Sequence, residues 1–265
     1  MLRADATSVV DRTGLDAIAL KPTECDVADA ASIPADAFAI DYEGREHVPD
    51  SDVLETLAAN ADVRVTTPVR ADGYDPLGDD SLVADLPASV GRVAVAGHPA
   101  YLTDDERSRA VAPRLGELLE TAPDAWVGTE SVERIAMATG ATQYDLLSRS
   151  TERELRALRA AGFDGEIAVY APTVLSDDED TILEAVGDYV ARRRPVASAL
   201  PDEDTDHDYD AGATGRTREV LLAAADDYTL VGTEDDVHAQ TETLREVGAT
   251  TVVGYPARGL GRFRK

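Results

Sequence analysis

Short aliphatic runs alternate along this chain with longer segments in which apolar residues recur every three or four positions. The short runs have the length and the β-branched content of buried strands, and the longer segments have the period of amphipathic helices. In chain order, the predicted strands are Leu15–Leu20, Ala37–Tyr42, Val63–Thr67, Arg92–Ala96, Ala125–Gly128, Tyr144–Leu147, Glu166–Tyr170 and Thr250–Gly254. Strands that alternate with helices are typical of a parallel sheet, and this set predicts an α/β fold, a closed (β/α)8 barrel of the TIM type.

A further strand-like run, Tyr228–Gly232, lies between two predicted helices. Because a (β/α)8 barrel takes eight strands, either this run or the short Tyr144–Leu147 run must lie outside the barrel. The chain has 265 residues, close to the ~250 that one such barrel needs. We therefore predict a single domain over residues 1–265, in which the acid-rich segment Pro201–Asp210 forms a solvated loop.

Polar cap residues precede the predicted helices. A Ser or Thr hydroxyl at this position accepts a hydrogen bond from a free backbone N–H, and a carboxylate in the first turn lies at the positive end of the helix dipole. The caps and their helices are Ser51 before Asp52–Leu57, Thr103 before Asp104–Leu119, Ser131 before Val132–Ala138, Ser176 before Asp177–Arg192 and Thr233 before Glu234–Val247. Hydroxyls with this structural role need no catalytic explanation.

The charge balance of the chain is strongly acidic. The 25 basic side chains face 52 acidic ones, which gives a net charge of −27, and only Lys21 and Lys265 are lysines. A hydrophobic content of 43% is ordinary for a folded domain, so the acids must coat a globular body. Molar salt shortens the Debye length to ~3 Å and screens such self-repulsion. We therefore expect a halophilic protein from a very salty cytoplasm, as in haloarchaea.

The same composition argues against several partners and sites. An acidic surface repels polyanions, because nucleic-acid binding depends on Lys and Arg at phosphates. No apolar run reaches the ~18 residues of a membrane span, and the N-terminus lacks a signal-peptide pattern. Cys25 is the only cysteine, which excludes an internal disulfide and a cysteine-cluster metal site. We expect a cytoplasmic protein with no nucleic-acid, membrane or metal partner.

Candidate catalytic residues follow the predicted strands, since barrel enzymes place their chemistry at the C-terminal strand ends. Lys21 follows the first strand, Glu43 the second and His98 the fourth. Lys21 could form a Schiff base or pair with a phosphate, or it could be bound in a salt bridge to Glu24. His98 could polarise a substrate carbonyl, or it could be a hydrogen-bonded histidine at the barrel rim. The sequence leaves both pairs of alternatives open.

Several segments resemble one known group of barrel enzymes. They are Leu230–Val237, Leu244–Ala249 and Thr251–Pro256 near the end of the chain, Ala125–Ser131 with Arg134–Thr139, Glu166–Ala171, and Val63–Pro68 with Gly91–Gly97. Together they resemble the luciferase-like flavin- or deazaflavin-dependent oxidoreductases, which include the methylenetetrahydromethanopterin reductases. The resemblance covers most of residues 60–258 and implies a barrel that holds a flavin-type ring at its C-terminal mouth.

The resemblance also implies a cofactor and residue roles. The cofactor is coenzyme F420, a deazaflavin, or FMN, and it exchanges hydride with a small-molecule substrate. Thr67 and Pro68 stand where the family supports the ring, Gly128 and Thr129 where it meets the phosphate end, and Tyr170 lines the pocket. His98 or Glu43 would transfer the proton. A homo-oligomer is compatible with this assignment.

Two other functions remain open at this stage. A barrel that has lost its cofactor would serve as a binding or regulatory protein. A barrel that uses the Lys21 amine would be a lyase or an aldolase.

Overall fold

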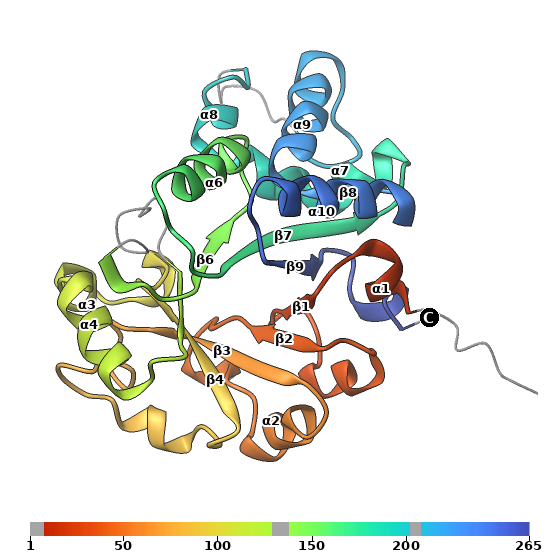
Figure 1. Ribbon diagram of the computed structural model, residues 1–265. Coiled ribbons are helices and arrows are strands. Elements are labelled where there is room, and N and C mark those ends of the chain that lie inside the picture. The colour runs from red at the N-terminus through yellow and green to blue at the C-terminus, as the bar shows by residue number, and fades with distance from the viewer. Residues whose placement is uncertain (1–7, 129–137, 202–207, 265) are drawn as a thin grey trace, which may run out of the picture.

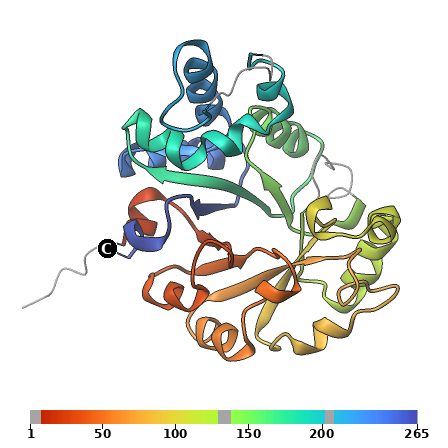
Figure 2. The same ribbon diagram turned by 180° about the vertical axis from the view of Figure 1, so that it is seen from behind.

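Eight parallel strands close into a barrel in the computed structural model, which describes residues 8–128, 138–201 and 208–264 (Figure 1, Figure 2). The barrel strands are β1 Ala17–Leu20, β2 Ala37–Ile40, β3 Asp62–Pro68, β4 Val90–Val95, β5 Trp126–Gly128, β6 Gln143–Leu146, β7 Ile167–Leu175 and β9 Thr251–Pro256. Neighbours along the chain pair from β1 to β7, β7 pairs with β9, and β9 pairs with β1 to close the ring. The predicted (β/α)8 barrel is confirmed.

The extra strand-like run lies outside the ring. It forms β8 (Leu230–Gly232), which pairs in parallel with the last three residues of β7, Thr173–Leu175. β6 occupies the barrel position between β5 and β7. The long β7 therefore pairs with β6 and β9 inside the ring, and its last residues pair with β8 outside it.

Helices surround the strands on the outside (Figure 1). The α-helices are α1 Val9–Thr13, α2 Ser51–Ala58, α3 Asp104–Ser108, α4 Val111–Thr121, α6 Thr151–Ala160, α7 Glu179–Ala191, α8 Arg194–Ala197, α9 Gly215–Tyr228 and α10 Glu234–Glu246. Short 3₁₀ helices are η1 Val27–Ser32, η2 Arg45–His47, η3 Ser81–Asp85, η4 Pro99–Tyr101 and η5 Leu260–Arg262. α8 and α9 pack with α7 beside β7 and β8. Within these residues, no helix has the length and apolarity of a membrane span.

Side chains along the strands alternate between the barrel interior and the helical layer. On β1 and β2 the inward positions carry alanines, and the space they leave is filled by large rings from β5, β6, β7 and β9. The inward cluster contains Ala17, Ala19, Ala39, Trp126, Tyr144, Tyr170 and Tyr255. The intervening residues, such as Ile18 and Phe38, pack outward against the helices. Small residues facing large ones fill the barrel, as its geometry requires.

Two predicted caps are correct. Thr103 accepts from the Glu106 N–H and the Glu106 carboxylate accepts from Thr103, which makes a capping box at α3. Thr233 and Asp236 form the same arrangement at α10. The single helix predicted over Asp104–Leu119 is nevertheless divided into α3 and α4. Pro113 has no N–H to donate, so a restart at Val111 places it in the first turn, where none is needed.

Two other caps are wrong. α2 begins at Ser51 itself, after Asp50, and the Ser51 hydroxyl donates to the Asp85 carbonyl (3.0 Å). α7 is capped by Asp178, which accepts from the Thr181 N–H, two residues beyond the expected Ser176. In both places an aspartate is the N-cap residue, but only the Asp178 side chain makes a capping hydrogen bond. The helix predicted after Ser131 and most of the acidic loop fall on residues 129–137 and 202–207, outside the described residues.

Candidate active site at the barrel mouth

Lys21 and Asp41 lie side by side at the C-terminal ends of adjacent strands. Each is the first residue after its strand, β1 for Lys21 and β2 for Asp41. The Asp41 N–H donates to the Leu20 carbonyl (2.8 Å), which continues the β1–β2 pairing up to this point. The parallel register therefore brings an amine and a carboxyl together at the barrel mouth.

Two tyrosines complete the group from the other side of β1. Tyr170 on β7 and Tyr255 on β9 both point inward, and their rings are parallel with centroids 6.3 Å apart. The Tyr170 hydroxyl donates to Asp41 Oδ2 (3.4 Å), and the Tyr255 hydroxyl donates to Glu24. Four neighbouring strands, β2, β1, β9 and β7, thus contribute one polar group each to a single place, which we name the mouth cluster: Lys21, Asp41, Tyr170 and Tyr255.

Lys21 makes two contacts at the mouth. Its Nζ lies 3.2 Å from Glu24 Oε1 and 4.1 Å from the centre of the Tyr255 ring. A carboxylate and the negative face of an aromatic ring both stabilise a cation. The mouth cluster therefore contains a basic group that is held against Glu24 and the Tyr255 ring.

Asp41 has an unusual protonation equilibrium. Loss of hydration in the crowded mouth raises its pKa to about 7, and the nearby Glu43 and Glu24 charges act in the same direction. The positive charge of Lys21 and the hydrogen bond from Tyr170 partly oppose this rise. A carboxyl that titrates near neutral pH can take up or release a proton during a reaction. The pKa of Tyr170 is raised well above its usual value, chiefly by burial, so Tyr170 stays a neutral donor.

Tyr144 adds a hydroxyl to the same wall. It lies on β6 with its ring 5.9 Å from that of Tyr170, and only 6% of it is exposed. Gly128 on the neighbouring β5 leaves room for it, because a Cβ there would come within 3.1 Å of the Tyr144 ring. Among the described residues the Tyr144 hydroxyl has no hydrogen-bond partner. A buried hydroxyl of this kind costs about 1–3 kcal/mol unless something else satisfies it.

Glu43, a predicted catalytic residue, lies at the edge of the mouth. Its carboxylate accepts from both the backbone N–H (2.8 Å) and the hydroxyl (2.7 Å) of Thr23. These bonds fix the loop that carries Lys21 and Glu24. The structure thus places Lys21, Glu43 and Tyr170 from the predicted set in one neighbourhood.

Other predicted residues lie elsewhere. His98 is exposed, and its Nδ1 accepts from the Ala100 N–H at the start of η4. Thr67 is fully buried on the outer face of β3, where its hydroxyl contacts the Val93 carbonyl (3.5 Å) and Arg92 Nε (3.2 Å). These side chains are not part of the mouth cluster.

The remaining predicted residues lie at strand ends. Pro68 closes β3 in regular register with Val95, so the strand has no bulge there. Gly128 closes β5 next to Tyr144, and Thr129 lies outside the described residues. Pro68 and Gly128 are both in register with Val95, so β3 and β5 end at the same level, and both residues are buried.

The sequence alone gave no functional role to Asp41, Tyr144 or Tyr255. The second strand was expected to run to Tyr42, which placed Asp41 inside it instead of at its end. The last strand was expected to stop at Gly254, which left Tyr255 outside it. The period of two along each strand could have found all three residues, because it assigns them to the inward face with Ala39 and Val253.

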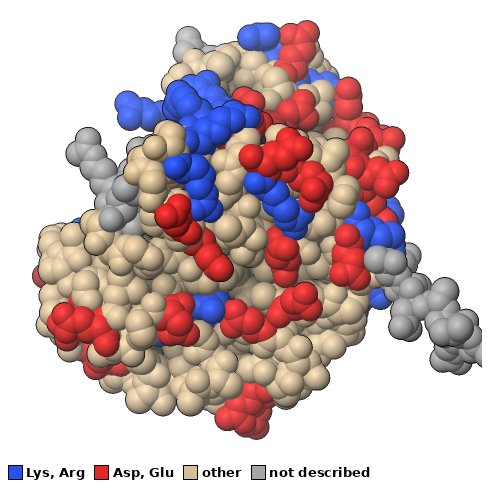
Figure 3. Space-filling model, viewed as in Figure 1, with Lys and Arg blue, Asp and Glu red and all other residues tan. Residues whose placement is uncertain are grey.

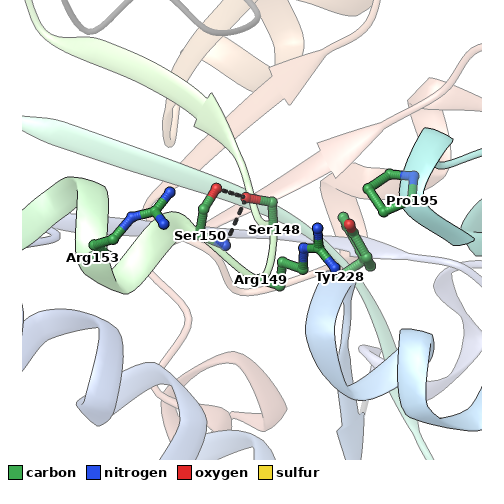
Figure 4. Close-up of a pocket in the computed structure, with 6 residues that line it drawn as sticks. All are labelled: Ser148, Arg149, Ser150, Arg153, Pro195 and Tyr228. Atoms are coloured by element: carbon green, nitrogen blue, oxygen red, sulfur yellow. Dashed lines mark hydrogen bonds between the residues drawn. The ribbon is translucent and has the colours of Figure 1, made fainter.

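A separate hollow opens beside the mouth, at the end of β6 (Figure 4). Its volume is about 480 Å³. It is lined by Ser148, Arg149, Ser150, Arg153, Pro195 and Tyr228, which come from the loop after β6 and from α6, α8 and α9. We name it the Arg–Ser hollow.

Comparison with solved structures supports the fold. The chain is similar to an F420-dependent secondary alcohol dehydrogenase in complex with an F420-acetone adduct, with a TM-score of 0.54 and 13% identity over 91% of this chain and 92% of the other. It is also similar to the monooxygenase RslO1 from Streptomyces bottropensis, with a TM-score of 0.52 and 16% identity over 94% of each chain. At this identity the likeness establishes a shared (β/α)8 barrel fold.

Comparison of sequences gives the family. No curated protein matches the chain. Residues 10–263 match the sequence model of a family described as a family of unknown function, DUF7388. This match spans the whole barrel, from α1 to the last turn after β9. The chain is therefore a member of the DUF7388 family, and its fold is a (β/α)8 barrel.

Proposed function

We propose that this protein is an oxidoreductase that transfers hydride between coenzyme F420 or FMN and the hydroxyl or carbonyl group of a small substrate at the barrel mouth. The observation that carries the proposal is the mouth cluster, in which Lys21, Asp41 and Tyr170 converge from separate strands. Interconversion of an alcohol and a carbonyl moves a proton on oxygen as well as a hydride on carbon. A site for it needs a positioned acid–base group and a positive charge near the oxygen.

The residues have separate roles in this proposal. Asp41 takes the proton from a substrate hydroxyl or returns it to a carbonyl oxygen, which its pKa of about 7 allows near neutral pH. The Lys21 ammonium stabilises negative charge on that oxygen. Tyr170 orients the Asp41 carboxyl through its hydrogen bond, and Glu43 positions the Lys21 loop through Thr23.

The wall of the mouth fits a flat ring with polar edges. Tyr144, Tyr170 and Tyr255 supply aromatic surface, and the unsatisfied Tyr144 hydroxyl offers a hydrogen bond to such a ring. When bound, F420 or FMN would supply or accept the hydride, which no side chain can do. A role for Thr67 would have to come from its backbone, because its side chain faces away. The F420-dependent alcohol dehydrogenase among the similar structures supports the same class of cofactor and substrate.

The geometry argues against a lyase that uses Lys21. A Schiff base needs a lysine amine that is free to attack a carbonyl, whereas the Lys21 amine contacts Glu24 and the Tyr255 ring. A cofactor-free binding protein would need no group that exchanges protons at the mouth. The acid–base pair thus favours the oxidoreductase over both alternatives.

The test combines cofactor binding with turnover. The full-length protein in molar KCl is titrated with F420 and with FMN, and is then assayed with the better cofactor on a panel of secondary alcohols and ketones by the cofactor absorbance. We expect Asp41→Asn to bind the cofactor with unchanged affinity and to lose about 10²-fold or more in kcat, the usual contribution of a general acid–base group.

Glu46→Gln is the matched control, since Glu46 is an exposed carboxylate in the same loop and lies outside the mouth cluster. It should retain full turnover. A protein that takes up neither F420 nor FMN would overturn the proposal in favour of a binding protein. Borohydride trapping of a carbonyl compound on wild-type protein, but not on Lys21→Arg, would overturn it in favour of a lyase.

A further inference from the structure

The Arg–Ser hollow is a positively charged site on a strongly acidic protein. Arg149 and Arg153 line it, and Arg193 lies behind it with its guanidinium 4.1 Å from the Tyr189 ring and 5.9 Å from the Tyr228 ring. Figure 3 shows Lys and Arg side chains gathered over α6 and α8, whereas Asp and Glu cover the neighbouring face. A net charge of −27 repels anions from the rest of the surface.

Among the described residues, Arg149 and Arg193 make no ion pair, whereas the exposed Arg153 pairs with the adjacent Glu154 (3.5 Å). Arg109 and Arg114 pair with the buried Asp75, and Arg245 pairs with Asp16. Within the ranges that the structure describes, Arg149 has no hydrogen-bond or ion-pair partner, and Arg193 Nε is buried without an acceptor. Guanidinium groups that stay unpaired amid so many carboxylates are available to an external anion.

The floor of the hollow supplies neutral donors. The Ser148 and Ser150 hydroxyls lie 3.0 Å apart and belong to the turn that leads into α6 (Figure 4). Ser150 is the N-cap residue of this ten-residue helix, but its side chain makes no capping bond, so it does not satisfy the first-turn N–H groups. Two arginines and two hydroxyls together suit a tetrahedral oxyanion with several acceptor atoms.

We propose that the Arg–Ser hollow binds the phosphate group of a phosphate monoester. Arg149 and Arg153 contact the phosphate oxygens, Ser148 and Ser150 donate hydrogen bonds, and the Tyr228 ring packs against the organic part of the ligand. The hollow lies on the mouth side of the barrel, after the end of β6, so the organic part can extend toward the mouth cluster. The proposal does not depend on the redox chemistry proposed above, because a phosphorylated substrate would satisfy it as well as FMN.

The experiment compares probes with and without the phosphate. Binding of FMN, riboflavin, glucose 6-phosphate and inorganic phosphate to the full-length protein is measured by calorimetry at one fixed KCl concentration. We expect a phosphorylated probe to bind at least ten-fold more tightly than its unphosphorylated counterpart. The double variant Arg149→Gln/Arg153→Gln should abolish that difference, while Arg156→Gln should keep it.

Arg156 is a suitable control because it lies on the same helix, is exposed and pairs with Glu152 (2.9 Å) outside the hollow. If FMN binds more tightly than riboflavin, the phosphate belongs to a flavin-type cofactor. If only glucose 6-phosphate or inorganic phosphate binds, the Arg–Ser hollow is a phosphate site, but the proposed use of FMN as a cofactor is wrong. Equal binding of FMN and riboflavin with no binding of the other two probes would overturn the proposal. So would a phosphate preference that survives in the double variant.

Discussion

The two ends of the barrel are built on the same contact but differ in what surrounds it. At the N-terminal end, the Arg64 guanidinium lies 4.7 Å from the centre of the Trp126 ring. At the C-terminal end, the Lys21 ammonium lies 4.1 Å from the centre of the Tyr255 ring. Both contacts place a cation on an inward-facing aromatic side chain, which stabilises the cation and fills the barrel.

The neighbours of the two cations make the difference. Arg64 also bonds to the Asp62 carboxylate (2.9 Å) and the Asp124 carbonyl (2.9 Å), so its charge and donors are used within the protein. Lys21 lies beside Asp41, a carboxyl that gains and loses its proton near pH 7. At the N-terminal end the polar groups are hydrogen-bonded within the protein and stabilise the fold, whereas at the C-terminal end a group that exchanges protons can act on a ligand. Substitutions of Trp126 and of Asp41 test this contrast directly.

The largest effect is expected from Trp126→Ala at the N-terminal end of the barrel. The substitution removes a buried ring under Arg64 and leaves a cavity, so we expect the free energy of unfolding to fall by about 3–5 kcal/mol. Denaturant unfolding in molar KCl measures the change. A loss below about 1 kcal/mol would mean that this end does not support the barrel.

A smaller effect of opposite sign is expected from Asp41→Asn at the mouth. The folded-state pKa of about 7 lies above the unfolded value of 3.8, so folding favours the protonated carboxyl. Its stabilising contribution is complete below about pH 4 and is lost as the pH rises through 7. Above pH 7 the variant should therefore be more stable than the wild type by about 1–3 kcal/mol, the usual cost of a poorly solvated polar group.

Unfolding curves of both proteins between pH 5 and pH 8 check this sign. The wild type should lose stability relative to the variant across that range, because the unfolded chain binds fewer protons than the folded one there. Parallel curves would show that Asp41 titrates at its ordinary pKa and would remove the distinction between the two ends.

The smallest effect is expected from Tyr144→Phe. The hydroxyl has no partner among the described residues, so its loss should change the free energy of unfolding by less than about 1 kcal/mol, or raise it slightly. The affinity for F420 or FMN should fall measurably, because a bound ring would lose a hydrogen bond. A large loss of stability would show instead that the hydroxyl is satisfied within the protein.

The barrel could be predicted because its signal is local. Strands such as Ala37–Ile40 and helices such as Glu234–Glu246 carry their own periodicity, and the alternation of the two types fixes a parallel sheet. The ninth run could not be assigned from the sequence. Whether Leu230–Gly232 or Gln143–Leu146 joins the ring depends on pairing partners far away in the chain, on β7 in both cases.

The candidate site could be predicted only in part. Lys21 and Tyr170 were identified because they lie beside or within clear strands, but Asp41 depends on where a strand ends, and strand ends are the least certain feature of a pattern. The Arg–Ser hollow corresponds to no motif in the sequence, because Tyr228 and Arg149 come together only through the packing of α9 against the side of the barrel. Contacts between distant segments, not residue types, created the rest of the site.

The most direct test is an NMR titration of the Asp41 side-chain carboxyl carbon in molar KCl, with the resonance assigned by its absence in Asp41→Asn. If the mouth cluster is a site of proton exchange, this carbon titrates with a midpoint near pH 7. A midpoint near pH 4, the ordinary value for an aspartate, would contradict the account.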